Sequence, residues 1–158
     1  MVVSELDKID LRVLQSLLED GRISFSAIAK DVGLTDVAIK KRFERLKRKG
    51  AIASISANLD LKVLGYENPI FVQMRSEISK NKNLVKRLRE FDSIVELYQV
   101  LGEYNLLAKL VVPNLEVAEK FIESLGTLDG VLDIKTSVIL SELKKTNSLP
   151  IFSLQKKL

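Results

Sequence analysis

The 158-residue sequence predicts an α+β protein: an N-terminal helix-turn-helix domain joined by a linker strand to a C-terminal ferredoxin-like βαββαβ domain. Three observations support this fold class. Apolar residues recur at helical spacing through the first fifty residues, a single alternating segment follows, and two strand–helix–strand patterns come after it. We therefore expect a helical domain over residues 1–50, a linker over 51–68 and a ferredoxin-like domain over 69–158.

Residues 1–50 predict three helices. The first ends at Gly21 and carries apolar residues at i, i+3 and i+4 spacing, namely Leu6, Ile9, Val13, Leu14, Leu17 and Leu18. The second begins after the N-cap residue Ser24 and ends at Gly33, and the third begins after Thr35 and runs to Gly50. Only the stretch "GLT" separates the second and third helices. So short a connection predicts a sharp angle, which is typical of a helix-turn-helix.

The linker at residues 51–68 predicts one extended strand, because Ile52, Ser54 and Ser56 alternate in side with the residues between them. One strand is too short to be stable alone. We expect it to pair with another strand, such as its copy from a second subunit. Asn68-Pro69 then marks the start of the next domain.

The second domain predicts four strands and two helices. The strands are expected at residues 70–78, 94–101, 105–112 and 131–140. The helices are centred on the apolar residues of 84–91 and 118–125. Two consecutive βαβ-like halves of this size are the ferredoxin-like motif. In the tail, Pro150 lies within an apolar stretch, which indicates an edge strand or an arm.

The third expected strand is apolar on both sides. Leu106, Ala108, Leu110 and Val112 occupy one side, while Leu107 and Val111 occupy the other with Lys109 as its lone charge. A sheet with both helices on one face normally has a polar second face. We therefore expect a dimer partner to cover this apolar face.

The composition excludes several classes of site. The chain has no cysteine and no histidine, which removes disulfides, thiolate nucleophiles and imidazole bases. It also has no phosphate-binding glycine motif. We therefore expect that the protein is not an enzyme and that it has no catalytic site, metal or cofactor. The N-terminus is charged where a signal peptide would be apolar, and no apolar run approaches membrane-spanning length. A cytoplasmic protein without a membrane segment is expected.

Positive charge is concentrated on the third helix. The net charge is only +4, but residues 40–49 carry seven bases against one acid, Glu44. Ile39, Phe43 and Leu46 keep a buried apolar stripe through the same segment. The second helix of a helix-turn-helix is the element that enters the major groove, so this arrangement predicts binding to double-stranded DNA.

The predicted DNA contacts divide by position. Residues near the start of the third helix are expected at base edges, namely Thr35, Asp36, Val37, Lys40 and Lys41. Residues further along are expected at phosphates, namely Arg45, Lys47, Arg48 and Lys49. Arg22 and Ser24 could add a backbone contact, since helix N-termini attract anions. Arg42 lies close to the buried stripe and either contacts DNA or braces the fold.

Two alternatives to a DNA interface stay open. A basic run is often only a solvated helix face. The protein could also be a metabolite-sensing oligomeric module whose helical domain binds a protein partner instead of DNA.

Motifs in both domains carry a family likeness. In the helical domain the matched pattern is Asp7, Ile9, Asp10, Asp20-Gly21-Arg22, Ala29, Val32-Gly33-Leu34, Arg42, Leu46 and Gly50-Ala51-Ile52. With this pattern the domain resembles that of the Lrp/AsnC (feast/famine) transcription regulators. "VLGEYNLLAKLVVP" (Val100–Pro113) resembles the family's glycine loop between strands two and three, and "GVLDIKTSVIL" (Gly130–Leu140) resembles its fourth strand.

The resemblance implies a sequence-specific transcription regulator that responds to a small effector such as an amino acid. Such proteins dimerise through their sheets and often assemble further; dimer, tetramer, octamer and ring stay open. By the same resemblance, the effector-binding residues would be Gly102, Glu103, Tyr104, Asn105, Thr136, Ser137 and Val138. The alternative is that "GEYN" serves only as a hairpin turn.

Overall fold

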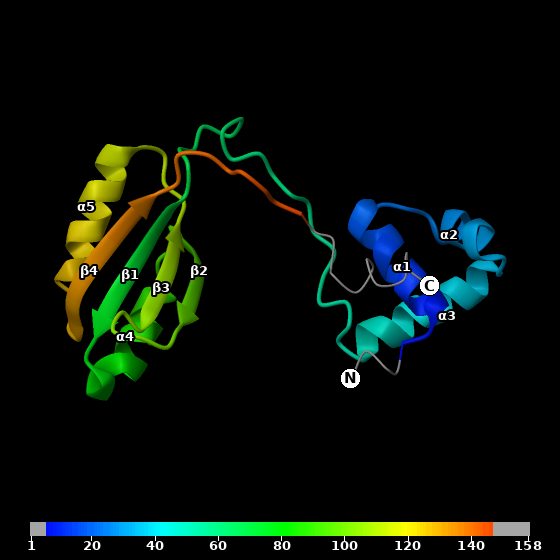
Figure 1. Cartoon of the computed structure of the whole chain (residues 1–158), viewed down its shortest axis with the longest axis horizontal. Helices are drawn as coiled ribbons and strands as arrows, with labels where there is room; N and C mark the ends of the chain where they lie inside the picture. Colours follow the sequence, from blue (N-terminus) through cyan, green and yellow to red (C-terminus); the bar gives the residue numbers. More distant parts are fainter. Residues whose placement is uncertain (1–5, 147–158) are drawn as a thin grey trace. The chain divides into compact units, whose positions relative to one another are not determined.

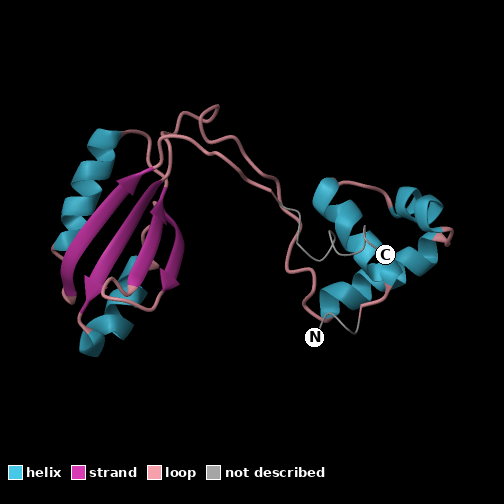
Figure 2. Ribbon diagram, in the orientation of Figure 1, coloured by secondary structure: helices cyan, strands magenta, loops and turns pink. Residues whose placement is uncertain are grey.

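The computed structural model describes residues 6–146 and divides the chain into two compact units (Figures 1 and 2). The first unit contains the helical residues up to Asn58, and the second spans Leu59–Leu143. The division between them falls inside the predicted linker. A helix-turn-helix followed by an α+β domain is thus confirmed as the fold class.

Three helices form the first unit: α1 (Lys8–Glu19), α2 (Phe25–Val32) and α3 (Asp36–Arg48). Each begins where a capping side chain accepts a hydrogen bond from the first turn, as the sequence predicts for Ser24 and Thr35. Gly33 ends α2 with a φ of 70°, which glycine adopts without strain and which turns the chain sharply into α3.

The helical unit packs around a small apolar core. Its buried residues come from all three helices and are Val13, Ile28, Ala29, Ile39 and Leu46. The rings of Phe25 and Phe43 lie 5.2 Å apart and join α2 to α3. This core fixes which side of α3 faces inward and which side faces solvent.

The second unit is a four-stranded antiparallel sheet in the order β2-β3-β1-β4. Its strands are β1 (Ile70–Ser76), β2 (Ile94–Gln99), β3 (Leu106–Leu110) and β4 (Val131–Val138). Its helices are the short 3-10 turn η2 (Ile78–Lys80), α4 (Asn81–Leu88) and α5 (Leu115–Gly126). Both crossovers carry a helix, which is the arrangement of the ferredoxin-like fold.

The two faces of this sheet differ. On one face, β1 and β3 bury alternate residues against Leu84 and Leu88 of α4 and Ala118 and Leu125 of α5. On the other face, which we call the open face, Leu107 and Val111 are only half-buried. Lys109 also lies there and forms an ion pair with Glu96 of β2 at 2.8 Å.

The predicted linker strand does not form within one chain. Residues 51–68, all of which the structure describes, contain a turn at 61–65 but no strand. A strand requires a neighbour for its ladder hydrogen bonds, so pairing with a second subunit stays a prediction. The predicted arm around Pro150 lies outside the described residues. Within residues 6–146, no helix has both the length and the apolar character needed to cross a bilayer.

Candidate nucleic-acid interface

Helix α3 presents two different surfaces. Ile39 and Leu46 are fully buried in the core of the helical unit. The other side is open to solvent and forms a surface depression lined by the exposed Val37, Lys40, Lys41, Glu44 and Arg48 and by the half-buried Arg42 and Arg45. The predicted basic helix is therefore packed on one side and open to solvent on the other.

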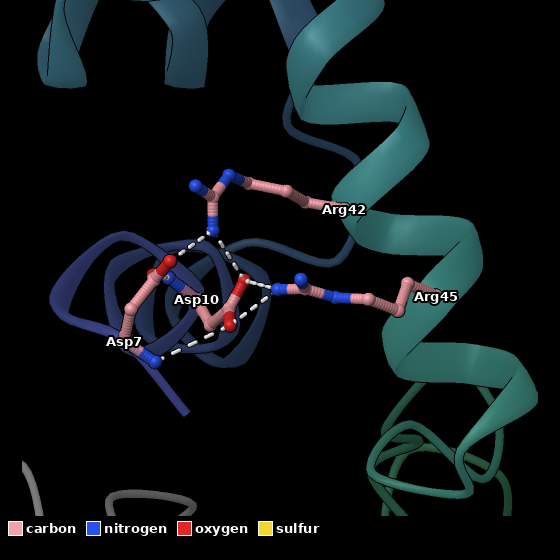
Figure 3. A network of polar contacts seen from close by, with 4 residues as sticks. All are labelled: Asp7, Asp10, Arg42 and Arg45. Atoms are coloured by element: carbon pink, nitrogen blue, oxygen red, sulfur yellow. Dashed lines mark hydrogen bonds and ion pairs between the residues drawn. The ribbon is translucent and has the colours of Figure 1, made fainter. Parts of the chain in front are cut away.

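Two arginines of α3 turn toward α1 and hold its first turn (Figure 3). Arg42 Nη1 lies 2.5 Å from Asp7 Oδ2 and 2.8 Å from Asp10 Oδ1. Arg45 Nη2 lies 2.6 Å and 2.5 Å from the two carboxylate oxygens of Asp10. Asp10 is only 1% exposed, so one buried carboxylate receives both guanidinium groups.

These ion pairs give Arg42 and Arg45 a structural role. For Arg45 the sequence predicts only a phosphate contact. A buried carboxylate strongly destabilises a fold unless it is paired and hydrogen-bonded. Both arginines meet that need for Asp10 and thereby attach α3 to α1. For Arg42, the geometry supports the second of its two predicted roles, bracing the fold.

Asp7 and Asp10 also cap α1. The backbone N–H of Asp10 donates to Asp7 Oδ1 at 2.7 Å, and the backbone N–H of Asp7 donates to Asp10 Oδ2 at 3.3 Å. Burial acts to raise the pKa of Asp7, but the Asp10 N–H and the Arg42 guanidinium outweigh it and lower that pKa below its usual value. Asp7 is therefore held in its charged form.

The other predicted DNA-contact residues are all exposed: Arg22, Ser24, Thr35, Asp36, Val37, Lys40, Lys41, Lys47, Arg48 and Lys49. The hydroxyl oxygens of Ser24 and Thr35 accept capping hydrogen bonds at 3.1 Å and 3.2 Å. Within the part of the chain that the structure describes, Lys40, Lys41, Lys47 and Arg48 form no ion pair. The positive charge of these four side chains is therefore directed to solvent.

The predicted effector loop is anchored to the end of β1. Gly102 has a φ of 136°, a conformation that favours glycine. Asn105 Oδ1 accepts hydrogen bonds from the backbone N–H and the hydroxyl of Ser76, both at 2.9 Å. Glu103 is exposed.

Tyr104 in this loop contacts two residues that sequence reasoning missed. Its hydroxyl donates to Asp133, and the Lys135 ammonium lies 4.1 Å from its ring centroid. The hydrogen bond to Asp133 raises the pKa of Tyr104 and lowers the pKa of Asp133.

The remaining predicted effector residues lie elsewhere on the sheet. Thr136, Ser137 and Val138 pair with Val72, Phe71 and Ile70, at the opposite end of β1 from Ser76. Val72 and Ile70 are four and six residues from Ser76, which is about 13–20 Å along a strand. Among the described residues no hydrogen bond joins Gly102–Asn105 to Thr136–Val138, although Tyr104 reaches Lys135, the residue before Thr136.

Comparison with known proteins gives a family for both units. Residues 6–47 match the model of the AsnC-type helix-turn-helix domain, and residues 70–149 match that of the Lrp/AsnC ligand binding domain. The chain is 30% identical over 146 residues to the HTH-type transcriptional regulator FL11 of Pyrococcus furiosus, covering 92% of this chain and 97% of that protein. It is 34% identical over 155 residues to the leucine-responsive regulatory protein of Klebsiella pneumoniae, covering 93% and 92%.

A solved structure agrees with these sequence matches. The feast or famine regulatory protein from M. tuberculosis complexed with L-methionine superposes with a TM-score of 0.81 at 25% identity, covering 89% of this chain and 95% of that one. The chain therefore belongs to the Lrp/AsnC family: it is a helix-turn-helix transcription regulator, as its sequence pattern predicts, and not an enzyme.

Proposed function

We propose that the exposed side of α3 enters the major groove of double-stranded DNA. Lys40 and Lys41 would then reach base edges, while Lys47 and Arg48 contact phosphates. The supporting observation is the division of the bases of α3 into two sets. Arg42 and Arg45 neutralise carboxylates of α1, whereas those four side chains have no ion partner in the described chain.

The remaining contacts of the proposed interface surround this basic surface. Thr35, Asp36 and Val37 form the exposed start of α3, and Arg22 and Ser24 form the exposed start of α2. Lys49 extends the surface beyond the end of α3. Arg42 and Arg45 are left out, because their guanidinium groups are engaged with Asp7 and Asp10.

Salt dependence tests the proposal. We expect in vitro selection to yield a pseudo-palindromic site whose half-sites lie about one DNA turn, or a multiple of it, apart. With phosphate contacts from Lys47, Arg48 and Lys49 in each of two chains, affinity for that site should fall about a thousandfold between roughly 50 and 200 mM salt. The measurement is fluorescence anisotropy with a labelled duplex across a salt series. A nearly flat salt dependence would contradict a phosphate-binding α3.

We also propose that two chains pair through the open face of the sheet. Phe71, Leu107 and Val111 present half-buried apolar side chains there. Tyr98 adds an exposed aromatic ring, and Val95 of the same strand is 51% exposed. Large exposed apolar patches on a folded chain mark interaction surfaces.

An amino acid is the proposed effector, bound between regulatory units. Relatives solved with L-methionine support the ligand class. Ser76, which holds Asn105, is about 13–20 Å along β1 from the residues that pair with Thr136–Val138, and this distance supports a site that takes residues from more than one chain. A ligand held in this way changes the assembly only by preferring one arrangement over another.

A substitution on the open face tests both proposals together. We expect Leu107→Glu to lower the solution mass to that of a single chain, because the carboxylate would be buried at the pairing surface. The same variant should lose binding of any amino acid that the native protein binds. Sedimentation and calorimetry with each of the twenty amino acids measure the two properties.

The matched control is Val117→Glu, on the exposed side of α5, which should change neither property. A Leu107→Glu variant that stays paired would contradict the open-face interface. A monomeric variant that still binds the amino acid would contradict a shared site.

A further inference from the structure

Residues 40–49 contain seven basic residues and one acidic residue, Glu44. Together with Val37, Lys40 and Lys41 it occupies positions i, i+3, i+4 and i+7 of α3, which lie on one side of a helix. All four residues are exposed, and all four line the depression on that side. Glu44 therefore lies at the centre of the surface proposed to face DNA, not at its margin.

No structural role within the fold accounts for Glu44. Among residues 6–146 its carboxylate forms no hydrogen bond and no ion pair, although bases lie three and four residues away on both sides. It lies outside the first turn of α3, so the helix dipole does not stabilise its negative charge. Asp36, in contrast, lies in the first turn, where a negative charge is stabilising.

Binding to phosphates does not account for Glu44 either. A carboxylate on a surface that approaches a polyanion repels it and weakens sequence-independent affinity. Base edges differ from phosphates in this respect. The cytosine N4 amino group is a hydrogen-bond donor in the major groove, and Glu and Asp are the side chains that accept from it.

We propose that Glu44 is a specificity-determining residue that accepts a hydrogen bond from a cytosine N4 amino group in each half-site. This inference rests on the proposed binding of α3 in the major groove. Adenine also presents an amino group there, but its neighbouring N7 is an acceptor and repels a carboxylate. Cytosine presents the donor without that acceptor, so a carboxylate selects cytosine.

The neighbouring lysines set where this cytosine should lie. A lysine ammonium donates to guanine O6 and N7, which makes guanine the expected base at Lys40 or Lys41. Glu44 is three to four residues further along α3, which is about 4.5–6 Å. That distance corresponds to one or two steps of about 3.4 Å in B-DNA. The selected half-site should therefore hold a guanine and a cytosine contact within about two base pairs.

In vitro selection with the full chain and three variants tests the inference. For the native protein we expect one half-site position to prefer cytosine by on the order of tenfold. Glu44→Gln should change that preference to adenine, because a glutamine amide pairs with adenine N6 and N7. Glu44→Ala should lose the preference at that position and bind random duplex more tightly, since a repulsive charge is removed.

The control variant is Glu19→Gln, which makes the same charge change at an exposed glutamate on α1. It should keep the native consensus. If it altered the consensus as Glu44→Gln does, net charge would explain the effect and the inference would be overturned. Circular dichroism of all variants should match the native protein, because both glutamates are exposed.

The outcomes separate this inference from the proposed function. If the native protein retained no duplex, DNA binding by α3 would fail and the Glu44 inference with it. If it selected a consensus without cytosine near the guanine, or if Glu44→Gln and Glu44→Ala left every position unchanged, only the role of Glu44 would fail. A change of preference from cytosine to adenine confined to one position of each half-site would support it.

Discussion

Reversing the charge of Lys40 and Lys41 to glutamate should lower affinity for the selected duplex by about a hundredfold or more. Two attractive side chains become two repulsive ones on the surface proposed to face DNA. The helices should stay folded, because both lysines are exposed and neither forms an ion pair among the described residues. Anisotropy measures the affinity, and circular dichroism and sedimentation measure the folded, assembled state.

The matched control is charge reversal of Lys82 and Lys86 on α4. Both are exposed lysines that form no ion pair in the described chain, and they lie in the sheet unit. This pair should leave DNA affinity within about twofold of the native value if the contact is limited to α3. Unchanged affinity in the Lys40 and Lys41 variant would instead favour a helical domain that binds a protein partner.

Replacing Arg42 and Arg45 together with methionine should destabilise the helical unit by about 3–5 kcal/mol. The double substitution leaves the Asp10 carboxylate, which is 1% exposed, with no cationic partner from α3. Hydrogen exchange of the full chain measures this effect directly. Amides of α1, α2 and α3 should exchange much faster, while those of β1 and β3 serve as an internal reference within the same molecule.

Two further variants make this result specific. Lys40→Met with Lys41→Met should lose DNA affinity but keep the native protection of the helices. Adding Asp10→Leu to the arginine variant should restore part of the lost stability, since no charge is then left buried. If the arginine variant kept its native protection and lost only DNA affinity, Arg45 would be the phosphate contact that the sequence predicts, and Arg42 would take the first of its two predicted roles.

Local signals explain why the helices and strands could be predicted. The side chains of Ser24 and Thr35 cap the helices that they precede, and Gly33 ends α2 in the conformation expected of it. The alternation of Leu106, Ala108 and Leu110 matches the fully buried side of β3. These features depend on residues a few positions apart, which is the range over which a sequence pattern is informative.

Contacts between distant residues explain what could not be predicted. Asp10 is 32 residues from Arg42 and 35 from Arg45, and a helical wheel alone cannot show that both arginines turn toward it. The pairing of Tyr104 with Asp133 spans 29 residues for the same reason. The linker strand does not appear in one chain, because no other segment of residues 6–146 provides it with ladder hydrogen bonds. The one local signal is the spacing of Asp7 and Asp10, three residues apart at a helix start, which is typical of a capping box.

The contacts of Asp10 have a consequence for how such a regulator could acquire new targets. The stability of the helical unit depends on the side of α3 that faces its core and α1. No contact within the described fold depends on the exposed side, at Val37, Lys40, Lys41 and Glu44. Evolution, or an engineer, could therefore recode the outward positions one at a time without first compensating for lost stability. Arg42 and Arg45 would stay unchanged in related regulators that recognise entirely different promoters, because the fold needs their ion pairs with Asp10.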